Sequence, residues 1–207
     1  PSQAFGAAGR QTADVTGKAT VKIDNATVRY LISGGLMYAK TAAIDIAITG
    51  ENTKISYALG GGYAPVGDGQ SLDKDFANAS NSIATTNFSM TKGTVNGAIC
   101  LGGGYSYSYA KDVTATLNGV TIKGGLYGIG WNGSSDKVNA TISNTTFNNV
   151  DGYTTIATLV RGKANEVSMA FDNCTFAEGY ECYLGADKDW QDGNYPTPVS
   201  GKTTMTF

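Results

Sequence analysis

The stretch ISNTTF, Ile142 to Phe147, decides the fold, because its pattern recurs along most of the chain. An apolar residue is followed by a polar residue, by Asn, Gly or Lys, by any residue, by Thr, and by a second apolar residue. We call each copy a hexad. The further copies are IDNATV from Ile23, MTKGTV from Met90, LNGVTI from Leu117 and FDNCTF from Phe171, with a degenerate copy, ITGENTKI, from Ile48.

The hexads return at nearly regular intervals. They begin at residues 23, 48, 90, 117, 142 and 171, so that the intervals are 25, 42, 27, 25 and 29 residues. The long interval contains a polar insert near 65–82, which we expect to form a loop on one coil. A repeat of about 27 residues indicates a solenoid, in which each unit becomes stable by stacking on its neighbours.

Each repeat contains short strands. Runs such as VTATL and VNATI, which precede hexads, alternate apolar and polar residues as a strand with one buried face does. A β-sandwich would not explain the same hexad in every repeat, and a propeller blade needs about 40–45 residues. The sequence therefore predicts an all-β chain: a right-handed parallel β-helix (β-solenoid) over residues 17–207, preceded by an N-terminal tail or assembly segment, residues 1–16.

Asn occupies the third hexad position in three copies, as Asn25, Asn144 and Asn173, and each of these begins an N-x-[ST] sequon. Asn side chains that stack in a solenoid turn hydrogen-bond to their own backbone and to their neighbours. This explains their recurrence at one position better than glycosylation does.

The hexads, together with the GGGY runs at Gly60 to Tyr63 and Gly102 to Tyr105, resemble the right-handed β-helix repeats of bacterial surface proteins and autotransporter passengers. The resemblance implies an extracellular location at a bacterial cell surface. That architecture hosts adhesins, polysaccharide lyases and hydrolases, and inert stalks alike, so the resemblance carries over the fold and not the function.

Composition and charge exclude several classes of function. The net charge is −2 and 15% of residues are charged, which gives no electrostatic footprint for nucleic acid. No apolar run approaches the ~20 residues of a membrane span, so no membrane insertion is expected. The chain has no histidine, which removes the common general base, the usual zinc ligand and any Ser-His-Asp triad. We therefore expect no catalysis.

One carboxylate cluster is a candidate Ca²⁺ site. Asp187, Asp189 and Asp192 lie within six positions and precede a Gly, and their oxygens are ligands of the kind that Ca²⁺ takes. The spacing does not match the EF-hand loop, and a solvated loop is the usual structure for such a composition. We therefore expect no cofactor, with Ca²⁺ kept as the alternative.

Aromatic residues form a candidate contact surface for a glycan or a protein partner. Tyr105, Tyr107 and Tyr109 alternate with small residues, so on a strand all three point to one side, which is either solvent or core. Trp190 and Tyr195 flank the carboxylate cluster and could stack on a sugar ring. Cys174 and Cys182 could pair in an oxidising compartment, which would leave Cys100 over, but three buried small apolar side chains are the favoured interpretation of the cysteines.

The last residues form a candidate assembly edge, composed of Thr203, Thr204, Met205, Thr206 and Phe207. GKTTMTF, from Gly201, aligns with GKATVKI, from Gly17, so that Phe207 falls on the first hexad position. Bare strand edges recruit other strands. We expect this edge either to continue into a longer chain or to associate with another copy, with residues 1–16 of the neighbour as one contact.

These observations predict an extracellular surface solenoid with a structural or adhesive role: a stalk, an adhesin segment or a subunit of a head-to-tail filament. A glycan or a host surface is the candidate ligand. The alternative is a carbohydrate-active β-helix, a lyase, a hydrolase or a binding module, that acts on an acidic polysaccharide. That alternative needs carboxylates and Lys or Arg brought together across coils, and the repeat positions offer no such cluster.

Overall fold

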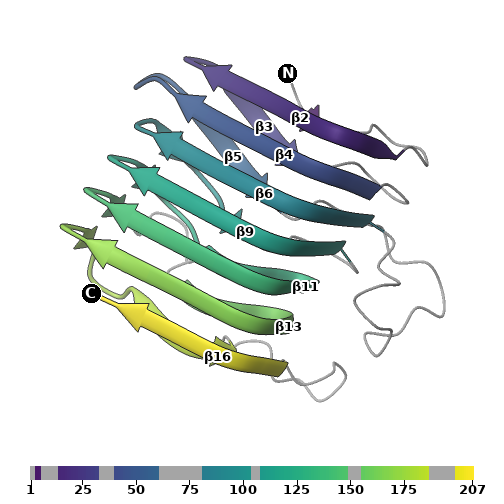
Figure 1. The fold of residues 1–207 in the computed structure, drawn as a ribbon. Coiled ribbons are helices and arrows are strands. Elements are labelled where there is room, and N and C mark those ends of the chain that lie inside the picture. The colour runs from purple at the N-terminus through teal and green to yellow at the C-terminus, as the bar shows by residue number, and fades with distance from the viewer. Residues whose placement is uncertain are drawn as a thin grey trace.

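The computed structural model describes residues 3–5, 14–32, 40–60, 81–103, 108–148, 155–186 and 199–207. In these ranges the protein is all-β, without a helix, and forms a parallel β-solenoid whose turns are about 27 residues apart, as the sequence predicts. The coils stack in chain order from β2 at one end to β16 at the other (Figure 1).

Three columns of strands build the coils, and all their pairings are parallel. The long-strand column contains β2 (Val15–Asp24), β4 (Lys40–Thr49), β6 (Asn81–Thr91), β9 (Ser108–Asn118), the second halves of β11 (Leu126–Ser143) and β13 (Thr155–Asp172), and β16 (Val199–Thr206). The short-strand column contains the first residues of β3 (Thr27–Ile32) and β5 (Lys54–Leu59), then β7 (Thr94–Val95), β10 (Thr121–Ile122), β12 (Thr146–Phe147) and β14 (Thr175–Phe176). The third column contains β1 (Gln3–Phe5), the ends of β3 and β5, β8 (Ile99–Cys100), the first halves of β11 and β13, and β15 (Glu181–Ala186).

The hexads coincide from coil to coil. Met90 pairs with Leu117, Leu117 with Ile142, and Ile142 with Phe171 in the long-strand column. The sixth hexad residues follow the same rule in the short-strand column, where Ile122 pairs with Phe147. The hexad is therefore the corner between two strands, repeated in register.

Positions one and six of the hexad point into the core. The first residues are buried in each copy, from Ile23 at 7% exposure to Met90, Leu117 and Ile142 at 0%. The sixth residues are buried as well, except that Phe176 in the last hexad is half-buried. These side chains belong to one continuous apolar cluster that runs the length of the stack. Each coil thus covers the inward apolar side chains of the coil before it.

The third hexad position adopts the left-handed backbone conformation in every copy. Its φ angles are 46° at Asn25, 94° at Gly50, 63° at Lys92, 65° at Gly119, 49° at Asn144 and 51° at Asn173. Gly and Asn tolerate this region best, which is the physical reason for their recurrence there. In the same turn, backbone hydrogen bonds join successive coils, as from Asn144 N to Asp172 O at 3.0 Å. The backbone ladder therefore continues around the corner.

The stacked Asn side chains form a ladder, as the sequence predicts for Asn144 and Asn173. Asn173 Nδ2 donates to Asn144 Oδ1 at 2.7 Å, and Asn144 Nδ2 donates to Asn118 Oδ1 at 2.9 Å. Where Gly119 takes the third position, its neighbour Asn118 supplies the acceptor. Asn25 instead accepts from the backbone N of Asn52 at 3.2 Å.

This geometry predicts how Asn144 variants behave. Asn144→Val should lower the free energy of unfolding by about 2–3 kcal/mol, because a left-handed conformation costs a branched residue about 1–2 kcal/mol and the lost hydrogen bonds about 1 kcal/mol. Asn144→Gly should lose only the hydrogen-bond part, about 1 kcal/mol. Urea unfolding of both variants measures the difference. Equal losses would show that the left-handed backbone does not select the residue.

Two segments bear on the domain boundaries expected from the sequence. β1, within residues 1–16, pairs in parallel with β3, Gln3 with Tyr30 and Phe5 with Ile32. In the insert near 65–82, residues 61–80 lie outside the described part, and β6 begins at Asn81. Despite the 42-residue interval, β4 and β6 keep the register, with Ile48 opposite Met90.

Candidate functional site

Most of the site residues suggested by the sequence lie outside the described residues. The candidate Ca²⁺ ligands and their flanking aromatic residues fall in 187–198, and two of the three alternating tyrosines fall in 104–107. These residues are Asp187, Asp189, Asp192, Trp190, Tyr195, Tyr105 and Tyr107. Of these candidates, the structure therefore places only Tyr109 and the assembly edge.

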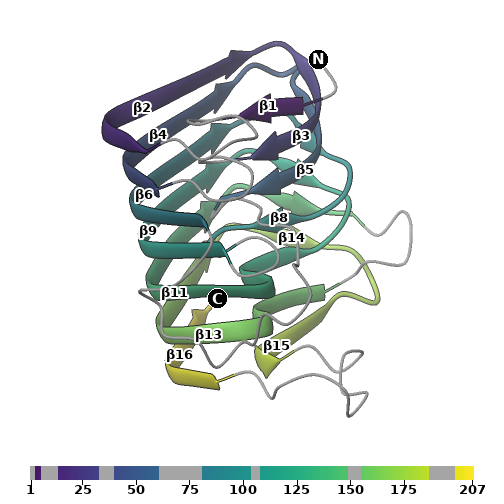
Figure 2. The same cartoon turned by 90° about the vertical axis from the view of Figure 1, so that its right-hand side faces the viewer.

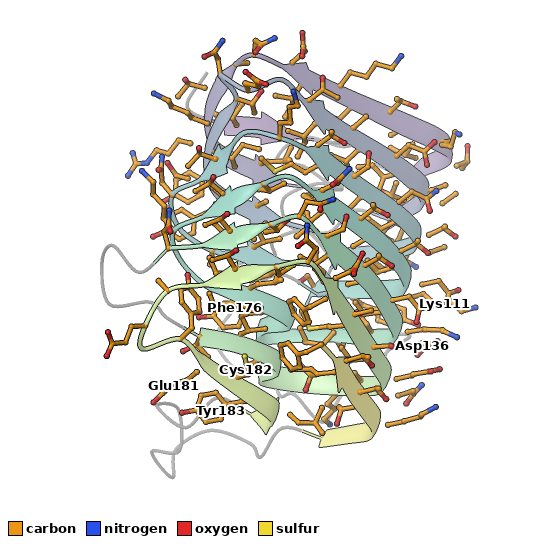
Figure 3. All side chains as sticks on the ribbon, turned by 90° about the vertical axis from the view of Figure 1, so that its left-hand side faces the viewer. Lys111, Asp136, Phe176, Glu181, Cys182 and Tyr183 are labelled. Carbon is orange, nitrogen blue, oxygen red and sulfur yellow. The ribbon has the colours of Figure 1, made fainter. Side chains whose placement is uncertain are left out.

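Tyr109 lies on β9 between Ser108 and Ala110, both of which are fully buried, so its own half-buried side chain is on the outer side of the strand. Burial, a hydrogen bond with Asp136 and the charge of that carboxylate together raise the pKa of the Tyr109 hydroxyl. Lys111 and Asp136 project from this same face of the solenoid (Figure 3). Tyr109 is thus part of a polar patch rather than an isolated aromatic contact.

The three cysteines carry free thiols. Cys100 is buried in the core, where desolvation raises the pKa of its thiol. Cys174 is half-buried in its hexad, and its Sγ lies 3.5 Å from the Ile142 and Asp172 carbonyl oxygens. Cys182 lies on β15 opposite the fully buried Ile156 but is itself exposed.

The outward side chains of the long strands form a surface that we call the polar wall. Most of its members are Thr, Ser, Asn and Ala, with Lys, Asp and Glu among them, and residues on neighbouring coils contact each other across it. Asn87 Nδ2 donates to Asp45 Oδ1 at 2.8 Å, and Lys18 Nζ lies 2.5 Å from Asp45 Oδ2. These contacts hold the pKa of the Asp45 carboxyl below its usual value, mainly through the hydrogen bond from Lys18. Such exposed pairs contribute little stability but do align neighbouring strands.

One row of the polar wall alternates in charge. Register places Asp112 opposite Lys137, Lys137 opposite Glu166, and Glu166 opposite Lys202 on four successive coils. Lys137 Nζ lies 3.4 Å from Glu166 Oε2. Opposite charges at directly neighbouring positions favour this pairing, whereas like charges oppose it. We call this set of residues the charge row.

At the C-terminal end, apolar side chains of the last described strands are exposed or half-buried. Met205 pairs with the fully buried Met169, yet is only half-buried. Phe207 follows at the position of Phe171, stacks on that ring at 5.0 Å and remains 67% exposed. Leu184 of β15 is 60% exposed. The alignment that places Phe207 on the first hexad position is therefore confirmed.

At the N-terminal end, the apolar residues Ala19 and Val21 of the first long strand are smaller than Met205 and Phe207 at the other end. Ala19 and Val21 of β2 pair with the buried Ile44 and Ile46, and both are half-buried. In the third column, β1 covers the end of β3. Figure 2 shows β1 and β2 at one end of the stack and β15 and β16 at the opposite end.

Sequence reasoning missed an aromatic pair on the outer side of the N-terminal coils. The Tyr30 and Tyr57 rings stack at 5.5 Å and 14°, and Arg29 lies 5.3 Å from the Tyr30 centroid. A Cβ atom at Gly97 would lie 2.7 Å from the Tyr57 ring, so the next coil supports that ring through glycine. The signal available in the sequence was the separation of the two tyrosines by 27 residues, the length of one repeat. The two rings pack on each other across neighbouring coils, and Tyr57 remains 37% exposed.

Within the described ranges, no three His, Cys, Asp or Glu side chains come together as a metal site requires. Nor does the described part contain a helix with the length and hydrophobicity of a membrane span. No family model, no curated protein and no solved structure matches this chain. What the structure establishes about its class is the parallel β-solenoid fold.

Proposed function

We propose that this protein is a structural or adhesive module of a bacterial cell surface, an extracellular β-solenoid without catalytic activity. The observation that carries the proposal is the exposure of two large apolar side chains, Leu184 and Phe207, on the last described strands of the solenoid. Exposed apolar patches mark interaction sites. The extracellular location is supported by the resemblance to surface β-helix repeats.

The rest of the molecule is consistent with a spacer. Backbone ladders continue through strands and corners, and side chains on neighbouring coils contact each other on the polar wall. Repetition of one coil gives a rod whose length is set by the number of repeats. A stalk, an adhesin segment and a filament subunit all use such a rod, and all need partners at its ends or sides. Glycans and host surfaces remain the proposed ligands.

The competing function is tested by an activity measurement. Incubation with pectin, polygalacturonate and alginate, with and without Ca²⁺, should yield neither unsaturated products nor new reducing ends. The reason is that the carboxylates and lysines that the described coils bring together, Lys18 with Asp45 and Lys137 with Glu166, are largely exposed ion pairs that occupy each other. The matched controls are Asp187→Ala and Asp189→Ala in the one acidic cluster that sequence analysis proposes. Turnover that either substitution abolishes would replace this proposal by the carbohydrate-active alternative.

A further inference from the structure

We infer that the outer side of the short-strand column binds a linear acidic polysaccharide whose chain runs along the axis of the solenoid. This inference rests on the proposed adhesive role, and it names the surface and the class of glycan that serve that role. It starts from the feature of the hexad that neither the core nor the left-handed corner explains, the Thr at the fifth position.

The fifth hexad residues point outward and form a row across successive coils. Register places Thr27 opposite Lys54, Lys54 opposite Thr94, Thr94 opposite Thr121, and Thr121 opposite Thr146. Each is exposed or half-buried, whereas the residue that follows it in the sequence is a buried core position. Thr suits this row for local reasons, because it favours strands and pairs with Thr on the next strand. Those reasons do not apply to Lys54.

A second outward row lies two residues further along the same strands. It contains Arg29, Ser56, Asn96, Lys123 and Asn148. The backbone ladder keeps these residues in register, since the N atoms of Asn96, Lys123 and Asn148 each donate at 2.8 Å to a carbonyl oxygen on the preceding coil. We call the two rows together the short face.

The short face is positively charged. Arg29, Lys54 and Lys123 lie on it, and its ten described side chains include no carboxylate. None of these three cations forms an ion pair with a described carboxylate. The two carboxylates at the adjoining corner of these coils, Asp24 and Glu51, each accept a hydrogen bond from a neighbouring coil. Because the whole chain has 15 basic and 17 acidic residues, the positive charge is local to this face and complements an anionic partner.

The dimensions of the short face fit one extended chain. Its rows are two residues apart, which is about 7 Å, and its five coils span about 19 Å at a strand spacing of about 4.8 Å. One pyranose unit adds a length close to the strand spacing, so each sugar of a chain along the axis lies beside one coil. Lys54 and Lys123 are two coils apart, which is the length of a disaccharide. The face therefore fits a polymer with a carboxylate on every second sugar.

A single-stranded nucleic acid is the other extended polyanion to consider. Its binding relies on aromatic rings on which successive bases stack. The short face instead presents hydroxyl and amide groups between its cations, and Tyr30 and Tyr57, whose rings stack on each other, lie at its border. Hydroxyls and amides both donate and accept hydrogen bonds, as the hydroxyls of a sugar do. The side chains between the cations therefore favour the polysaccharide.

Isothermal titration calorimetry of the full chain tests the inference. The probes are a hyaluronan hexasaccharide, which carries a carboxylate on every second sugar, and the neutral chitin hexasaccharide of the same length. The acidic probe should bind at least about tenfold more tightly, and added salt should weaken its binding. Lys54→Gln and Lys123→Gln should each weaken it by about three- to tenfold, because each removes one charge that faces a carboxylate.

Two further variants separate the hydroxyls and the general charge from the face itself. Thr121→Val removes a hydroxyl from the first row without a change of charge, and should weaken binding of the acidic probe by about two- to fivefold. Lys111→Gln is the matched control for the two Lys variants, since Lys111 is exposed and projects from the polar wall (Figure 3). It should bind the acidic probe within about twofold of the wild type.

Four results would overturn the inference. These are no binding of the acidic probe, equal affinity for the acidic and neutral probes, equal weakening by Lys111→Gln and the two short-face variants, or equal affinity for a single-stranded oligonucleotide with the same number of charges. Product analysis of the same mixtures keeps the proposed function separate. Cleavage of a bound probe would contradict the absence of catalysis and leave the binding face standing, whereas a lack of binding leaves the structural role intact.

Discussion

Phe147→Ala is expected to lower the free energy of unfolding by about 3–5 kcal/mol, the range for removing a fully buried aromatic ring. Phe147 is 0% exposed and is surrounded by rings. It stacks on Phe176 at 4.9 Å and meets Phe171 and Tyr180 edge-on at 6.0 and 5.7 Å. The cavity would lie between two coils, so both lose contacts.

The loss should be local in the first instance. In a solenoid each coil contacts only its neighbours, so weakened protection in hydrogen exchange should centre on β10, β12 and β14. Urea unfolding followed by circular dichroism measures the total loss. Thr116→Ala, on the exposed side of β9, should stay within about 0.5 kcal/mol of the wild type. A loss below about 1 kcal/mol for Phe147→Ala would contradict a close-packed core at this corner.

Gly124→Ala is the second large expected effect, with a loss of about 3 kcal/mol from overpacking. An added Cβ would lie 2.0 Å from the Gly97 carbonyl oxygen on the preceding coil. The obstacle is backbone, which cannot turn aside as a flexible side chain can. In addition, Tyr180 Oη donates to the Gly124 carbonyl oxygen at 3.0 Å, so a shift of this corner disturbs the coils on both sides.

Gly17→Ala is the matched control for Gly124→Ala. A Cβ at Gly17 meets no atom within 4 Å, and its φ lies outside the left-handed region. The same chemical change should therefore alter stability by no more than about 0.5 kcal/mol. Thermal unfolding of the two variants side by side measures the contrast. Similar melting temperatures for both would mean that the coils do not approach as closely as the structure indicates.

The repeat and its corner were predictable from sequence because they depend on local chemistry. Burial of Ile142 and Phe147 follows from the alternation of apolar and polar residues within one strand and turn. The selection of Asn144 and Gly119 follows from a backbone conformation that few residues adopt. These preferences act within a few residues of one another and recur in each copy, so a single sequence reveals them.

The fourth hexad position shows where local patterns stop being informative. It accepts any residue in the sequence pattern, yet Val120 and Thr145 are buried there. Thr53, which precedes the matching Thr-equivalent Lys54 in the longer copy from Ile48, is buried as well. The hydroxyls are satisfied by the corner itself, as when Thr145 Oγ1 donates to the Ser143 carbonyl oxygen at 2.9 Å. A small hydroxyl residue is therefore tolerated at this buried position, although its polarity predicts a position exposed to solvent.

The sequence by itself determined the class of fold, the period and the inward positions, because those depend on contacts within one repeat. Tertiary structure alone decided what happens between repeats. Coil lengths vary from 25 to 42 residues, so the neighbour of each residue across the stack depends on how every intervening loop closes. The charge row, the stacked Tyr30 and Tyr57 and the place of β1 in the third column arise in this way.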